Sequence, residues 1–113
     1  MARYLISFPS GAMQVTPEEL EQASIDSHEV VRAAKAAGVW VFGGGIDEDV
    51  PPVRVHADGS ITEDTYEQTR RLEGGYTVID VPTRAEAEDW ARKIAVACRC
   101  PQELRVFMHD PES

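Results

Sequence analysis

The sequence has few cysteines, no long apolar segment and a shortage of basic residues. Its two cysteines, Cys98 and Cys100, are separated only by Arg99, and a disulfide across so short a loop would be strained. A metal site would need more ligands, and the nearest, His109, lies nine residues on with no second pair. We therefore expect two reduced thiols, which are typical of cytoplasmic proteins, and neither a metal nor an organic cofactor.

No apolar run approaches the roughly 18 residues needed to span a bilayer. The short apolar stretch of residues 4–8 meets Pro9 too early for a secretory signal. The 11 basic residues are outnumbered by 20 acidic ones, which gives a net charge of −9. A nucleic-acid partner requires a basic surface, and an anionic membrane repels an acidic one. We expect neither partner.

Two helices are predicted by repeated start signals. Thr16 with Glu19, and Thr83 with Glu86, have the Thr-x-x-Glu spacing of a capping box, so a helix should begin after each threonine. Gly38 is suited to end the first helix in the left-handed conformation. The buried stripes should consist of residues three or four positions apart: Leu20, Ala23, Ser27, Val30, Val31 and Ala34, then Ala87, Trp90, Ala91, Ile94 and Cys98.

Strands are predicted where apolar residues alternate or run together: residues 4–8, 39–42, 76–81 and 103–108, with a hairpin of residues 53–56 and 61–62. Asp58-Gly59 forms the turn of that hairpin. The triplet Gly43-Gly44-Gly45 interrupts the second strand and indicates a bulge or a close approach of backbone. Residues 63–73 should form a loop with one helical turn at most.

This order predicts one α+β domain over residues 1–113, with the ferredoxin-like plan β-α-β-β-β-α-β and an antiparallel sheet. Two crossover helices can cover only one face of the sheet. A second copy of the chain is the simplest cover for the other face, which predicts a homodimer with its sheets face to face. An exposed, partly polar face is the alternative.

Several short segments along nearly the whole chain carry a family resemblance. They are Arg3-Tyr4-Leu5-Ile6, Ala36-Ala37-Gly38, Gly43-Gly44-Gly45-Ile46, Val53-Arg54-Val55, Asp58-Gly59, Gly74-Gly75-Tyr76, Ala87-Glu88-Asp89-Trp90-Ala91 and Glu103-Leu104-Arg105-Val106. In these segments the chain resembles the YCII-related family, including the branch named for a DGPF motif. The motif itself is degraded here, because Glu63-Asp64-Thr65-Tyr66 stands in its place, followed by Gln68 and Arg70. The resemblance implies a ferredoxin-like fold that dimerises into an α+β barrel, with a cleft where a histidine and an aspartate act together.

His28 and Asp47 are the candidate site residues. His28 matches the family's first-helix histidine, and it lies near the boundary between the buried stripe and solvent, where an imidazole can line a cleft and transfer protons. Asp47 follows the glycine triplet and would orient the ring; Glu48 or Asp49 could take its place. The alternatives are a solvated helix histidine and an acidic, solvated loop.

Three functions remain open at this point. The first is a small lyase- or isomerase-type enzyme without a cofactor, in which His28 is the general base for a small aromatic or oxygenated metabolite in a dimer cleft. The second is a non-catalytic dimer that binds a small molecule in the same cleft. The third is a protein-interaction or regulatory module that uses the acidic side chains of the first helix: Glu18, Glu19, Glu21, Asp26 and Glu29.

Overall fold

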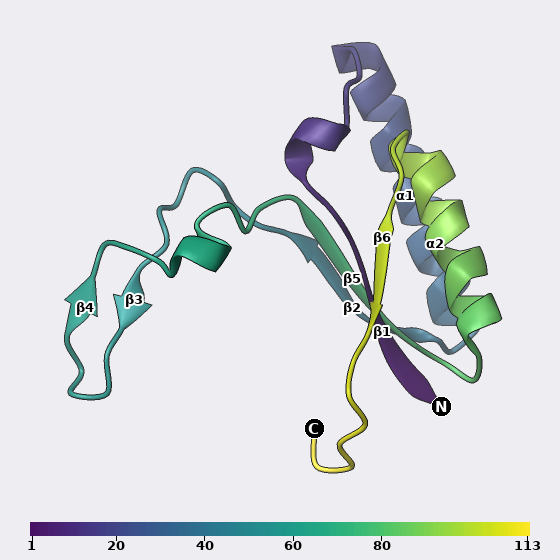
Figure 1. Ribbon diagram of the computed structural model, residues 1–113. Coiled ribbons are helices and arrows are strands. Elements are labelled where there is room, and N and C mark those ends of the chain that lie inside the picture. Colours follow the sequence, from purple (N-terminus) through teal and green to yellow (C-terminus); the bar gives the residue numbers. More distant parts are fainter.

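The computed structural model describes residues 1–113 and has six strands and two α-helices. Neither helix combines the length and the apolar composition needed to cross a membrane. In chain order the elements, with the short 3₁₀ helices η1 and η2, are β1 (Ala2–Phe8), η1 (Ser10–Ala12), α1 (Pro17–Ala36), β2 (Trp40–Gly45), β3 (Arg54–Val55), β4 (Ile61–Thr62), η2 (Glu67–Thr69), β5 (Gly75–Val81), α2 (Arg84–Cys98) and β6 (Glu103–Val106) (Figure 1).

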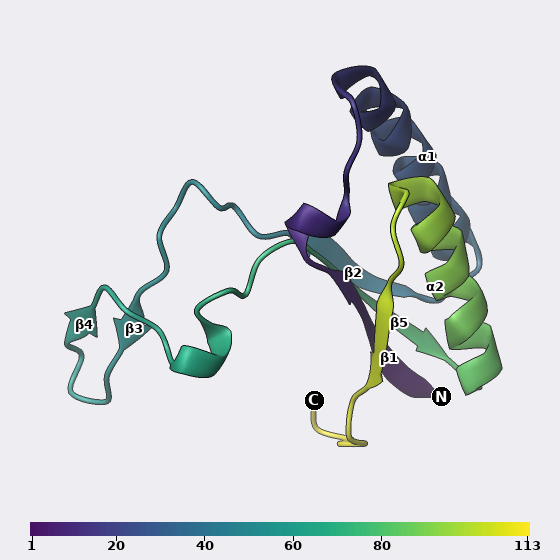
Figure 2. The same cartoon turned by 45° about the horizontal axis from the view of Figure 1, so that its top comes forward.

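Four strands form one antiparallel sheet in the order β2-β5-β1-β6. Both α-helices lie on the same side of it, as the two views in Figures 1 and 2 show. The predicted α+β class and antiparallel sheet are confirmed, and the arrangement is compatible with a ferredoxin-like fold. The predicted order was one strand short, because β3 and β4 each count as a strand. They pair in a separate two-stranded sheet.

Both predicted helix starts are confirmed. The side-chain oxygen of Thr16 accepts a hydrogen bond from the backbone N–H of Glu19 at 3.2 Å, and Thr83 accepts one from Glu86 at 3.2 Å. These bonds satisfy N–H groups that have no partner within the helix. Gly38 follows α1 with a φ of 74°, as predicted.

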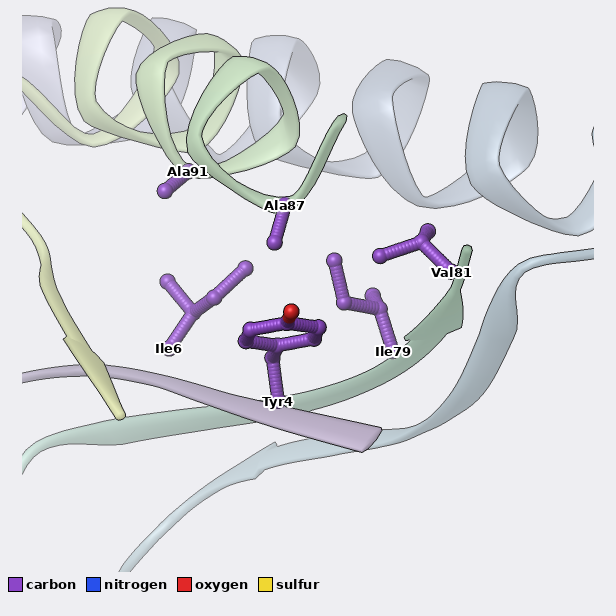
Figure 3. Close-up of a cluster of buried hydrophobic side chains, with 6 residues drawn as sticks. All are labelled: Tyr4, Ile6, Ile79, Val81, Ala87 and Ala91. Atoms are coloured by element: carbon purple, nitrogen blue, oxygen red, sulfur yellow. The ribbon is translucent and has the colours of Figure 1, made fainter. Parts of the chain in front are cut away.

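The core lies between the sheet and α2 (Figure 3). Tyr4 and Ile6 of β1 and Ile79 and Val81 of β5 point toward the helices. Their partners on α2 are two alanines, Ala87 and Ala91, whose small side chains let the helix approach the sheet closely. Burying each of the larger aliphatic side chains stabilises the fold by about 1.5–3 kcal/mol.

The predicted helix stripes are only partly correct. Ala23 and Ala34 are buried on α1, but Leu20 is 52% exposed because the first turns of α1 extend beyond the end of α2. Trp90, predicted as core, is only half-buried, and the Lys93 ammonium lies 4.3 Å from its ring centroid. The last strand ends at Val106, two residues before the predicted end.

The prediction that the glycine triplet interrupts the second strand was wrong, because the triplet forms the second half of β2. The pairing with β5 shifts register between Trp40 and Phe42, so the bulge lies just before the triplet at which a bulge was one of the two predicted alternatives. The predicted close approach is also present, because a Cβ on Gly43 would lie 2.5 Å from the Trp40 ring. Phe42, which pairs with Val78 on the face away from the helices, is 64% exposed in the single chain.

Residues 46–73, called the arm below, leave the sheet after β2 and return at β5 (Figures 1 and 2). Arg54 donates to both carboxylate oxygens of Asp64, at 3.1 and 2.5 Å, and lies 5.2 Å from the Tyr66 ring centroid. The Thr62 hydroxyl donates to Asp64 at 2.5 Å and accepts from His56 Nε2 at 3.0 Å. The degraded motif therefore helps to hold the hairpin together.

Candidate functional site

A cavity of about 570 Å³ lies between α1 and the β2 edge of the sheet, and its lining includes residues from both faces of this edge strand. Its volume is in the range of small-molecule sites. His28 and Lys35 enter it from α1, Cys98 from α2 and Gln102 from the segment before β6. The rest of the lining is mainly apolar or glycine: Phe8, Val30, Val31, Trp40, Val41, Phe42, Gly43, Gly44, Gly45, Gly75 and Ile94. We call this the α1–β2 cavity.

Trp40 forms an aromatic wall of this cavity. One edge of its ring lies over Gly43, in space that a side chain would otherwise fill, since a Cβ there would approach Trp40 Cη2 to 2.5 Å and Cζ2 to 2.6 Å. The bulge in β2 puts Trp40 and Gly43 on the same face, opposite Ile79 and Thr77 of β5. The absence of a side chain at Gly43 thus leaves room for this edge of the indole.

His28 lines the cavity and has a defined tautomer in its neutral form. Its Nδ1 lies 2.6 Å from the backbone carbonyl oxygen of Ser24, one turn earlier on α1. A carbonyl oxygen can only accept, so Nδ1 carries the proton and Nε2 keeps its lone pair. Nε2 is therefore free to accept a hydrogen bond or a proton. The His28 side chain is exposed in the single chain, and its partner is this carbonyl rather than a carboxylate.

Asp47 lies elsewhere. It lines a second cavity, of about 580 Å³, at the base of the arm, together with Glu48, Arg70 and Glu73. One Asp47 carboxylate oxygen accepts from the backbone N–H of Asp49 at 3.0 Å, which is a local turn. Within one chain the two predicted site residues do not line the same cavity, and their pairing stays a prediction.

Several lining residues were not singled out from the sequence as site candidates. Lys35 follows His28 by seven positions, two helical turns, so its place on the same face of α1 could have been read from the spacing. Thr77, Cys98 and Gln102 come from other elements, and only the tertiary structure brings them to the cavity.

The two thiols are free, as predicted, and both are buried. Burial, together with the neighbouring Cys100 thiol, raises the pKa of Cys98. Burial also raises the pKa of Cys100. Both side chains are therefore neutral thiols near pH 7, and Cys98 contributes a neutral, weakly polar group to the cavity.

Fold and cavity together define a class: a small α+β protein with two helices on one face of an antiparallel sheet and a cavity under the first helix. No protein-family model matches the chain. No curated protein gives a significant match either.

Proposed function

We propose that this chain is a cytoplasmic, YCII-related protein that binds a small planar metabolite in the α1–β2 cavity. The observation that carries this function is the free Nε2 of His28 at a cavity with an indole wall. Aromatic side chains bind flat ligands through dispersion and ring stacking. A single well-placed acceptor such as Nε2 then fixes the ligand's orientation.

A homodimer with a ferredoxin-like barrel arrangement is part of the proposal. The sheet face without helices, called the open face below, includes Leu5, Phe42, Tyr76 and Val78, because these alternate with the core residues of their strands. Phe42 is largely exposed and the other three are partly buried. A second copy would remove this apolar surface from water on both chains at once.

A proton-transfer enzyme of the lyase or isomerase type is the second candidate, and the tautomer of His28 favours it. A general base needs a lone pair facing the substrate, and Nε2 has one. Asp47 of the same chain lines the other cavity. A carboxylate that orients His28 would therefore have to be that of Asp47 in the second copy of the chain.

Binding is tested with phenol, a planar neutral probe whose hydroxyl can donate to Nε2. In ¹H–¹⁵N NMR titrations we expect saturable shifts at the amides of Gly43, Gly44 and Thr77 and at the Trp40 indole. His28→Ala should weaken binding, and His56→Ala on the arm should not. Shifts that are absent, or that cluster away from the α1–β2 cavity, would contradict the proposed site.

Catalysis is tested with phenylpyruvate in deuterium oxide. A general base at His28 would remove a proton from the carbon next to the carbonyl and return a deuteron, so deuterium incorporation should exceed the buffer rate. His28→Gln should abolish the excess while His56→Gln keeps it. If phenylpyruvate binds but exchanges at the buffer rate, the protein is a binder and the enzyme candidate is rejected.

A further inference from the structure

The α1–β2 cavity differs in charge from the rest of the molecule. The chain has 20 acidic residues among 113, yet none of the 18 residues that line this cavity is an aspartate or a glutamate. With His28 neutral, the one charged side chain in the lining is Lys35. The cavity is therefore a locally positive region on an acidic protein.

The Lys35 ammonium has no carboxylate partner, since none of the chain's ion pairs includes it. Lys93 of α2 provides the contrast, because its ammonium lies 3.2 Å from Asp89 Oδ2 and over the Trp90 ring. The charge of Lys35 is therefore not neutralised by an ion pair within the chain and is available to an anionic group of a ligand.

The spacing of His28 and Lys35 along α1 also limits the length of a ligand that contacts both side chains. Seven residues along an α-helix correspond to about 10 Å between their backbones. Both side chains enter the same cavity, and the Trp40 ring lies on the sheet side of it. A single aromatic ring with polar groups at its two ends matches this separation.

We propose that the ligand is a planar carboxylate of about one ring, a proposal that rests on the function proposed above. Its carboxylate pairs with Lys35, its ring stacks on Trp40, and a hydroxyl at the far end donates to Nε2 of His28. A carboxylate forms an ion pair with an unpaired ammonium, whereas a neutral amide can accept a hydrogen bond from it but lacks the attraction between opposite charges.

The probes are 4-hydroxybenzoate and its neutral isostere 4-hydroxybenzamide. The chain has two tryptophans, so Trp90→Phe leaves Trp40 as the sole tryptophan reporter of binding. In fluorescence titrations of that protein we expect the acid to bind about tenfold more tightly than the amide. Lys35→Met should remove the preference and Lys35→Arg should restore most of it. Lys93→Met, the matched control, should leave it unchanged.

The outcomes separate the two proposals. If acid and amide bind equally, or if Lys35→Met leaves the preference intact, the carboxylate inference is overturned while binding in the cavity stands. If neither probe changes the Trp40 signal and neither shifts the cavity amides, both proposals fail. Loss of the acid's advantage in 0.5 M salt and in Lys35→Met alike would support the inference.

Discussion

At the scale of single residues, the cavity depends on the absence of a side chain at Gly43. Gly43 leaves room for one edge of the Trp40 ring, whereas Gly44, next in the chain, faces the other side, where an added Cβ would lie 3.5 Å from the Phe42 ring. The glycine triplet predicted a close approach at this point. It did not show which side chain would use the space, because that depends on the bulge and on pairing with β5.

We expect Gly43→Ala to destabilise the protein by about 1–3 kcal/mol, as other overpacking substitutions do, because its Cβ would displace the Trp40 ring. The same variant should lose affinity for phenol. Denaturant unfolding and the NMR titration measure the two effects. Gly44→Ala is the matched control, since its Cβ would meet the Phe42 ring at an ordinary 3.5 Å. Equal effects of both substitutions would disprove the role of Gly43.

At the scale of elements, the helices and the arm differ in how they are fixed. Capping fixes the starts of α1 and α2 through bonds within a few residues of each threonine. The arm is anchored instead by hydrogen bonds between residues far apart in the sequence, Ser10 and Glu73. The backbone N–H of Ser10 in η1 donates to Glu73 at 3.2 Å, and its hydroxyl also hydrogen-bonds to that carboxylate and, at 3.2 Å, to Glu48.

This anchor should depend on pH. The Ser10 hydroxyl, followed by Glu48 and the Ser10 backbone, lowers the pKa of Glu73 below its ordinary value of 4.5. A carboxyl with a depressed folded-state pKa stabilises the fold above its unfolded pKa. That contribution is lost as pH falls through the folded value. We expect Ser10→Ala to reduce the loss of stability between about pH 5 and pH 3.

Denaturant midpoints across this range measure the Ser10→Ala effect. Ser27→Ala is a suitable control, because the Ser27 hydroxyl donates only to the Ser24 backbone carbonyl on α1. If Ser10→Ala and wild type lose stability in parallel on acidification, the anchor does not involve the ionised Glu73.

At the scale of the whole molecule, the single chain leaves much apolar surface in water. Only 13 of 113 residues are buried, and large apolar side chains remain exposed on the open face and on the arm. Phe42 is 64% exposed, and Val50, Val53, Val55 and Ile61 on the arm are between 51% and 68% exposed. Association with a second copy would remove apolar side chains of the open face from water.

We therefore expect a solution mass of twice the 12.5 kDa chain in light scattering after size exclusion. Phe42→Glu places a charge on the open face and should shift the protein toward the monomer. Val96→Glu is the control, because Val96 lies on α2, away from the open face, and is 68% exposed. A wild-type monomer, or dissociation by Val96→Glu alone, would contradict a dimer formed through the open face.

The sequence by itself determined the features that depend on neighbouring residues: the two capped helices, the Gly38 helix end, the Asp58-Gly59 hairpin and the α+β class. It also placed a histidine at the edge of the buried stripe of α1, and that histidine lines the cavity. Only the tertiary structure decided that His28 and Asp47 line separate cavities, and that Trp40, Lys35 and Cys98 meet at one of them. The physical reason is that strand pairing and the direction of the arm set these distances, and neither is encoded in any short segment.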